Sequence, residues 1–249
     1  MRTALAVLSL CTAAGAARAD TAAVAEARRL LTTYDQDLSR LDRARSLLEA
    51  EARQDAPAET WIHLARACFL WGELRAKGVE EKLSAYDAGR SAARTATERA
   101  PANPDAHFWL AANGGRWARA AGGLRALSVL SEVRSEVDTV LKMEPQHALA
   151  QGLAGSMLAD TPPFLGGDRA GAERHFRKGL EIDPRLTGLR VELARLLINT
   201  SRMDEAREQL GRVIDEKAPT YHAAWAAKDV PEARRLLTVV AERQRATSP

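Results

Sequence analysis

The sequence feature that most constrains the fold is the stretch from 166 to 184, GGDRAGAERHFRKGLEIDP. Its landmarks follow one another at spacings of four, three and five residues, and they are Ala172, Phe176, Gly179 and Pro184. On a helix, the two small residues let a paired helix approach closely, and the aromatic side chain fills the space toward a neighbouring unit. Proline then ends the helix. The stretch therefore predicts the second helix of a two-helix unit.

The same pattern returns 34 residues later, where Ala206, Leu210 and Val213 occupy the corresponding places. A two-helix unit with this period resembles the tetratricopeptide repeat, whose hairpins stack because each pair alone leaves an apolar flank uncovered. The resemblance extends over about residues 57–217. It implies an all-α solenoid of four to five helix pairs. Since no segment alternates apolar and polar residues, we expect no sheet.

Acidic residues and prolines mark the expected helix starts. Asp168 is placed to cap the helix that follows it, and Asp183 is placed to cap the next one with Pro184 in its first turn. Pro219 and Pro231 suit the first turns of two further helices, over 219–227 and 231–245.

The chain divides into three parts by its patterns. Residues 1–19 read as a signal peptide, as argued below. Residues 20–56 contain two amphipathic segments and are expected to form an N-terminal helical cap over the open end of the stack. The rest, residues 57–249, is the expected repeat domain.

Several features depart from a regular repeat. The linker GELRAKGVEEKL is either an insertion or the end of an unusually long helix. Gly114 and Gly115 lie inside an expected helix, where they predict a kink or a close contact between backbones. A loop with two prolines and two glycines leaves Phe164 and Leu165 to dock on some apolar surface.

The N-terminus has the composition of an export signal. Arg2 supplies the positive end, residues 4–10 form a short apolar run, and Ala17–Arg18–Ala19 is a small-x-small cleavage site. The alternative is an N-terminal helix of a cytosolic protein. Cys11 follows a segment close to a bacterial lipoprotein box, but leucine precedes it where a small residue is usual. We therefore favour cleavage near Ala19 and a periplasmic protein over a lipoprotein.

The remaining composition argues against several functions. Removing residues 1–19 takes away two arginines and leaves 34 basic against 33 acidic residues, so the chain has no electrostatic signature of nucleic-acid binding. Cys68 is then the single cysteine, and it has no partner for an intramolecular disulfide. The five histidines form no H-E-x-x-H pair, and no nucleophile elbow or phosphate-binding loop occurs. We expect no enzyme activity, metal or cofactor.

The first helices of stacked repeats line a concave face, and counting positions along them gives a candidate groove for a ligand or peptide. The residues at these positions are Ile62, Arg66, Phe69, Phe108, Ala112, Arg116, Ser156, Val191, Arg195 and Asn199. Arginines flanked by apolar residues would suit a ligand with an apolar body and an anionic end, or a peptide bearing a carboxylate. The alternative is that the arginines are solvated or paired with Glu59, Glu73 and Glu192, and that the aromatic residues are core.

Two segments, HFWLAANGGRWARAAG at 107–122 and PPFLGGD at 162–168, resemble a narrower group. They are similar to the periplasmic T-component that accompanies tripartite ATP-independent periplasmic (TRAP) transporters. The resemblance implies a helical protein, often lipid-anchored, that assembles into a ring-like trimer. It also implies association with a solute-binding P-component and a pore or cavity for apolar ligands.

The sequence thus predicts a non-enzymatic periplasmic binding or scaffolding protein. Its expected partners are a solute-binding protein and an apolar or amphipathic small molecule. The alternative is a general tetratricopeptide scaffold in cell-envelope assembly, where the groove binds peptide segments of other proteins.

Overall fold

The structure is a computed structural model and describes residues 21–247. The predicted signal peptide, with Cys11, lies outside the described residues. Between residues 21 and 247 every regular element is helical, which confirms the predicted fold class. None of the helices in this part of the chain is both long and apolar enough to cross a membrane.

Ten helices form five successive pairs. They are α1 (Ala22–Leu30) with α2 (Ser39–Glu51), α3 (Ala58–Leu74) with α4 (Val79–Arg99), α5 (Pro104–Ala121) with α6 (Gly123–Met143), α7 (Ala148–Asp160) with α8 (Arg169–Ile182), and α9 (Thr187–Asn199) with α10 (Met203–Asp215). The short 3-10 helix η1 (Pro163–Leu165) lies between α7 and α8. The chain continues through α11 (His222–Ala224), the π-helical segment η2 (Trp225–Asp229) and α12 (Val230–Thr247).

The repeat landmarks lie where the pattern predicts them. The five landmarks with a side chain on the predicted helix faces are all buried: Ala172, Phe176, Ala206, Leu210 and Val213. Pro184, which follows the helix, is exposed. A Cβ atom at Gly179 would lie 2.5 Å from Cδ2 of Leu189 and 3.0 Å from the carbonyl oxygen of Ala148. The small residue therefore lets α8 approach α7 and α9 closely, as the spacing predicts.

The linker GELRAKGVEEKL and the glycine pair Gly114–Gly115 both belong to long, closely packed helices or to the short turn between them. Helix α3 continues to Leu74 and α4 begins at Val79, so the long-helix interpretation of the linker is correct. Helix α5 runs unbroken through the paired glycines. A Cβ at Gly114 would lie 2.7 Å from Cγ2 of Val133 on α6, so this glycine makes room for a side chain of the paired helix rather than for another backbone.

Three local predictions are wrong. Asp183 and Pro184 do not open α9, because Pro184 and Arg185 form a turn and the N–H of Arg185 donates to Oδ1 of Asp183 at 2.9 Å. The helix starts only at Thr187. Phe164 does not dock on an apolar surface but is 85% exposed, because the loop closes on itself through backbone hydrogen bonds and turns this ring outward.

The third correction concerns the helix predicted at 219–227, whereas the helix predicted at 231–245 is present as α12 with Pro231 in its first turn. Pro219 lies outside any helix, and the chain from His222 to Thr247 is instead one helical run. Pro231 has no N–H to donate to the preceding turn. That turn is wound as the π-helix η2, in which the N–H of Val230 donates to the carbonyl of Trp225, five residues earlier.

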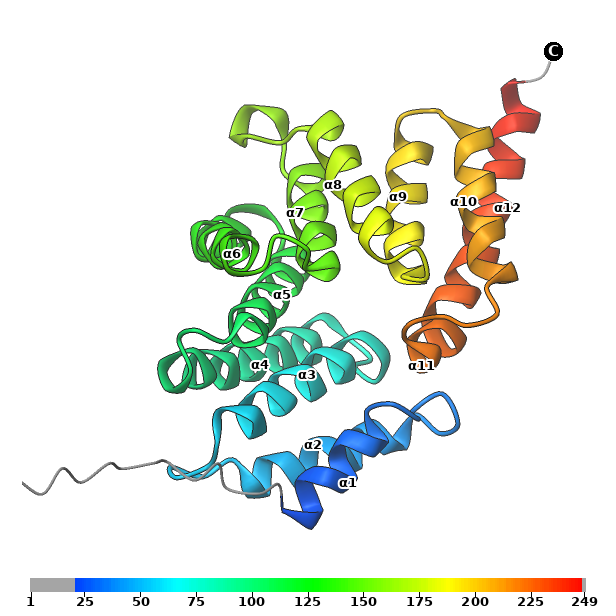
Figure 1. The fold of residues 1–249 in the computed structure, drawn as a ribbon. Helices are drawn as coiled ribbons and strands as arrows, with labels where there is room; N and C mark the ends of the chain where they lie inside the picture. The colour runs from blue at the N-terminus through cyan, green and yellow to red at the C-terminus, as the bar shows by residue number, and fades with distance from the viewer. Residues whose placement is uncertain (1–20, 248–249) are drawn as a thin grey trace, which may run out of the picture.

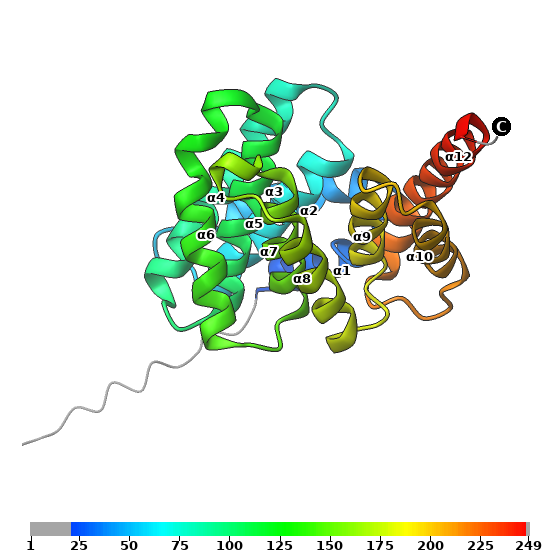
Figure 2. The same ribbon diagram turned by 90° about the horizontal axis from the view of Figure 1, so that it is seen from above.

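The stack curves until its last elements meet its first. Figure 1 shows the row of pairs passing from α1 and α2 through α5 to α9 and α10. The chain then reaches α11, next to the N-terminal helices, and continues from there into α12. Figure 2 shows the same arrangement from above, with α12 extending away from the N-terminal pairs. Ala223 belongs to the same buried cluster as Leu30 and Leu31 of the first pair. His222 Nδ1 also lies 3.4 Å from Oδ2 of Asp35, so both apolar and polar contacts close the curve.

Candidate binding surface

Helices α3, α5, α7 and α9 carry the ten predicted groove residues, but these residues differ in exposure. Four are buried in the packed interior: Ile62, Phe108, Ala112 and Val191. Five are half-buried: Arg66, Phe69, Arg116, Ser156 and Arg195. Asn199 is exposed. A ligand on this inner face would therefore meet mainly the half-buried side chains. That these residues bind a ligand stays a prediction.

A half-buried glutamate on α3 meets cations from two other elements. The side chain of Glu73, near the end of α3, is 13% exposed. Its Oε1 accepts a hydrogen bond from the hydroxyl of Tyr86 at 2.7 Å and lies 3.4 Å from Nε of Arg116, and Lys228 of η2 forms an ion pair with Oε2. Burial alone would raise the pKa of Glu73. The two cations and the hydrogen bonds outweigh that effect and hold the pKa well below its usual range.

A second glutamate, Glu192 of α9, is surrounded by arginines at longer distances. Its carboxylate oxygens lie 3.8 Å from Nη2 of Arg116, 3.9 Å from Nη1 of Arg119 and 3.9 Å from Nε of Arg195. These separations exceed a hydrogen bond, so the contacts are electrostatic and loose. The Nε atom of Arg195 is buried and has no hydrogen-bond acceptor among the described residues.

Two further pairs complete this group. Arg119 Nε donates to Oδ2 of Asp160 at 3.0 Å, and Arg195 Nη2 donates to Oε1 of Glu232 at 2.6 Å. We call the whole set the inner-face charge cluster, and its members are Glu73, Arg116, Arg119, Asp160, Glu192, Arg195, Lys228 and Glu232. The set joins α3, α5, α7, α9, η2 and α12.

The pairing foreseen as the alternative to ligand binding is present in part. Arg116 lies beside Glu73 and Glu192, and Arg195 lies beside Glu192. Sequence reasoning missed Lys228 and Glu232, because neither stands at a groove position of a first helix. Lys228 is 155 residues from its partner Glu73, and no local pattern connects such distant positions.

Aromatic rings form the floor beside the charge cluster. Phe69 meets Trp109 edge-on, with ring centroids 5.6 Å apart, and lies 6.2 Å from the ring of Tyr86. The guanidinium of Arg116 lies over Phe69, 5.7 Å from its centroid. The surface therefore combines an apolar floor with paired charges.

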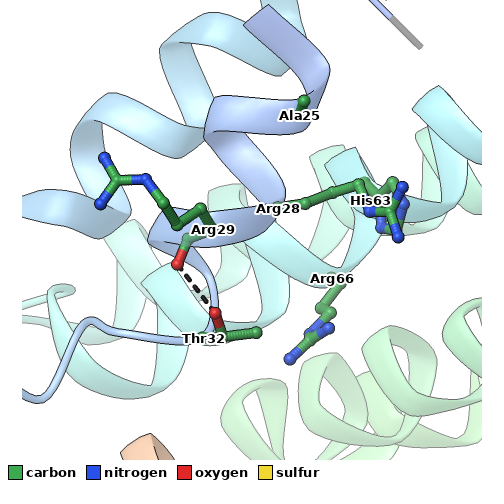
Figure 3. A pocket seen from close by; sticks show the side chains of 6 residues that line it. All are labelled: Ala25, Arg28, Arg29, Thr32, His63 and Arg66. Atoms are coloured by element: carbon green, nitrogen blue, oxygen red, sulfur yellow. Dashed lines mark hydrogen bonds between the residues drawn. The ribbon is translucent and has the colours of Figure 1, made fainter. Parts of the chain in front are cut away.

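A separate cavity of about 410 Å³ lies where α1 meets α3. Figure 3 shows its lining: Ala25, Arg28, Arg29, Thr32, His63 and Arg66. Arg66 donates from Nη2 to the carbonyl oxygen of Leu31 at 3.3 Å, and burial lowers the pKa of its guanidinium. Within residues 21–247, no group of three or more histidine, cysteine or acidic side chains is arranged to hold a metal ion.

Comparison with known proteins places the chain in a family. The family model described as "Regulator of microtubule dynamics protein 1-3" matches residues 23–158, more than half of the chain. The chain belongs to this family. A second model, for a tetratricopeptide repeat, matches residues 164–228 of this regulator-of-microtubule-dynamics family member. No curated protein sequence matches the chain significantly.

Two solved structures are similar to the chain to different degrees. A thermophilic tetratricopeptide protein of Thermus thermophilus is 21% identical, with a TM-score of 0.60 over 86% of this chain and 98% of that one. An assembly chaperone of RpL4 is 17% identical, with a TM-score of 0.45 over 90% of this chain and 87% of that one. The first likeness shows a tetratricopeptide-type helical solenoid, and the second carries no argument.

Proposed function

We propose that this protein is a non-enzymatic scaffold that binds a segment of a partner protein on the inner face of its helical stack. The observation that carries the proposal is the loose packing of charges around Glu192, where three arginines lie 3.8–3.9 Å from one carboxylate. Contacts of this length exchange readily with the charges of a partner, whereas an isolated structural ion pair would be closer. The neighbouring ring of Phe69 offers apolar contact to the same segment.

Site-specific photo-crosslinking tests this proposal. A benzophenone side chain at Ser156, half-buried on α7, would lie on the inner face beside the charge cluster. The matched control carries the same group at Arg212 on α10, whose side chain is 56% exposed and paired with Glu208. The proposal predicts crosslinks to a defined segment of one partner from position 156 but not from position 212. Equal crosslinking from both positions would contradict it.

The proposed setting is the cell envelope, with export after cleavage near Ala19. The basis is the positive end, short apolar run and small-x-small site of residues 1–19. The intact mass of the protein recovered from its natural host tests this directly. A mature chain beginning at Asp20 supports export, a lipid-modified Cys11 supports anchoring, and an unprocessed chain contradicts both.

A second candidate is a role like that of the TRAP-associated T-component, with an apolar or amphipathic ligand and a solute-binding protein as partners. The segments at 107–122 and 162–168 favour it, and so does the 85% exposure of Phe164 within the second segment. Native mass spectrometry of the purified protein would then detect co-purified lipophilic molecules and a trimer. An empty monomer that captures no solute-binding protein would count against this role and leave the protein-binding scaffold as the proposal.

A further inference from the structure

One cation on the inner side of the stack differs from all members of the charge cluster. Arg66 of α3 is half-buried, and its guanidinium has one long contact, at 3.3 Å, with the carbonyl of Leu31. Among residues 21–247, no carboxylate oxygen lies within 4.0 Å of it, whereas Arg116 has two glutamates near it. A desolvated guanidinium without a carboxylate is unfavourable in the free protein, and an incoming anion would relieve this.

Further basic side chains line the same cavity as Arg66. Arg28 and Arg29 come from α1, and His63 stands one turn before Arg66 on α3. Figure 3 shows the Arg28 side chain reaching toward His63, the Arg66 side chain pointing to the space near Thr32, and the Arg29 guanidinium directed away. The cavity that these residues line has a volume of about 410 Å³, which is enough for several non-hydrogen atoms of a ligand.

The acidic group nearest in influence is already engaged. The carboxylate of Asp105 on α5 interacts electrostatically with Arg66 and His63. Its Oδ1 lies 3.8 Å from Nε2 of His147, so it also interacts with that imidazole. Tyr34 and Tyr221 face Arg66 as neutral phenols, because burial raises the pKa of both hydroxyls. Within residues 21–247 Arg66 therefore lacks a carboxylate in direct contact, in contrast to the paired members of the charge cluster.

We propose that the cavity lined by Arg28, His63 and Arg66 binds an acidic side chain of the partner segment, with its carboxylate seated on the Arg66 guanidinium. This inference rests on the proposed function, since it assigns the chemistry of the same partner. A planar guanidinium fork matches a carboxylate with two parallel N–H···O bonds. Phe69 lies one turn further along α3, so a segment anchored at Arg66 continues over the aromatic floor.

Fluorescence anisotropy with labelled peptides tests the inference. The probes are an eight-residue peptide rich in glutamate and its glutamine counterpart, each titrated with the full chain at low salt. We expect the glutamate peptide to bind at least about tenfold more tightly, and Arg66→Gln to remove that preference. Arg212→Gln, on an exposed and paired arginine of α10, should leave it unchanged. Equal binding of both peptides, or full retention of the preference in Arg66→Gln, would overturn the inference.

Two additional measurements keep the outcome interpretable. Arg66→Lys retains the charge but loses the fork, so it should fold as the wild type does and bind the glutamate peptide more weakly.

Inorganic phosphate should not displace the peptide at concentrations where free glutarate does; preferential displacement by phosphate would mean that the cavity selects a tetrahedral anion, against the inference. Crosslinks from position 156 that persist in Arg66→Gln with unchanged partner affinity would sink this inference and leave the scaffold intact. Binding of the acidic peptide without crosslinks from position 156 would contradict the proposed scaffold function and leave the anion-binding cavity supported.

Discussion

The two halves of the repeat domain follow the same plan with helices of different length. Helices α7 to α10 have 13 or 14 residues, whereas α3 to α6 have between 17 and 21. The additional turn of α3 carries Glu73, and that of α5 carries Arg119. These are the side chains that reach Lys228, Asp160 and Glu192 in the C-terminal half. Lengthening the first helices of the N-terminal half thus supplies charged contacts between the halves, in addition to the contacts of Ala223 and His222 that close the curve.

The largest expected effect lies in the regular C-terminal half. Phe176 is fully buried between α7, α8 and α9, so Phe176→Ala should lower the free energy of unfolding by about 4 kcal/mol. Phe164→Ala, which removes an exposed ring from η1 in the same half, should change it by less than about 0.5 kcal/mol. Urea unfolding followed by circular dichroism measures both. Similar losses in the two variants would contradict the repeat packing.

The next effect tests the contact between the halves. Glu73→Gln leaves Lys228 without its acidic partner and Arg116 with only the more distant Glu192, and should lower the free energy of unfolding by about 3 kcal/mol at neutral pH. Glu208→Gln, at an exposed pair with Arg212, should lower it by less than about 0.5 kcal/mol.

The pH dependence of the stability of wild-type protein and of Glu73→Gln sharpens this test. Because the folded pKa of Glu73 is depressed, its contribution is present above the unfolded pKa of about 4.3 and is lost as the pH falls toward the folded pKa. Wild-type protein should therefore lose more stability below about pH 4.5 than Glu73→Gln does. Parallel acid profiles for the two proteins would argue against a paired Glu73.

A pair of glycines compares the packing density of the two halves. A Cβ at Gly89 would lie 2.2 Å from Oδ1 of Asn113, which is fully buried and bonded to the carbonyls of Ala65 and Trp109. Gly89→Ala should therefore lower the free energy of unfolding by about 2 kcal/mol. Gly211→Ala on α10, where the added methyl group meets open space, should raise it by about 0.5 kcal/mol. Losses of equal size in thermal unfolding would mean that the halves pack alike.

The smallest expected effect comes from a second buried carboxyl, on the C-terminal side of the closure. Burial raises the pKa of Asp229, although Thr187 donates a hydrogen bond to its Oδ2 at 2.7 Å. A raised folded pKa means that ionisation weakens the fold above that pKa, so the sign is opposite to that for Glu73. Asp229→Asn keeps a side-chain oxygen that accepts the hydrogen bond from Thr187. It should raise the free energy of unfolding by less than about 1 kcal/mol at about pH 7. This increase in the free energy of unfolding should shrink as the pH falls. A variant that is less stable than the wild type both at about pH 7 and at about pH 4 would contradict a raised pKa for Asp229.

The regular half could be predicted from the sequence because its determinants are local. Ala172, Phe176 and Gly179 lie within two turns of one helix, so their spacing alone reports which face is buried. The closure of the curve could not be predicted, because Glu73 and Lys228 are 155 residues apart and each resembles an ordinary surface charge. The ten candidate groove residues lie on α3, α5, α7 and α9, and that they bind a ligand stays a prediction.

Its details were less predictable. Counting positions cannot tell which side chains the curvature buries, and it treated Ile62 and Arg66 alike. The structure separates them: Ile62 is core, and Arg66 faces a cavity.

The most direct test of the account is a double-mutant cycle between Glu73→Gln and Lys228→Gln, with free energies of unfolding from urea titrations at neutral pH. The account holds that these two residues meet across the inner face and join the two halves. It predicts that the double variant is more stable than the sum of the single losses implies, by about 1–2 kcal/mol. Losses that add to within about 0.3 kcal/mol would show that the two side chains do not interact, and the closed arrangement of the halves would be contradicted.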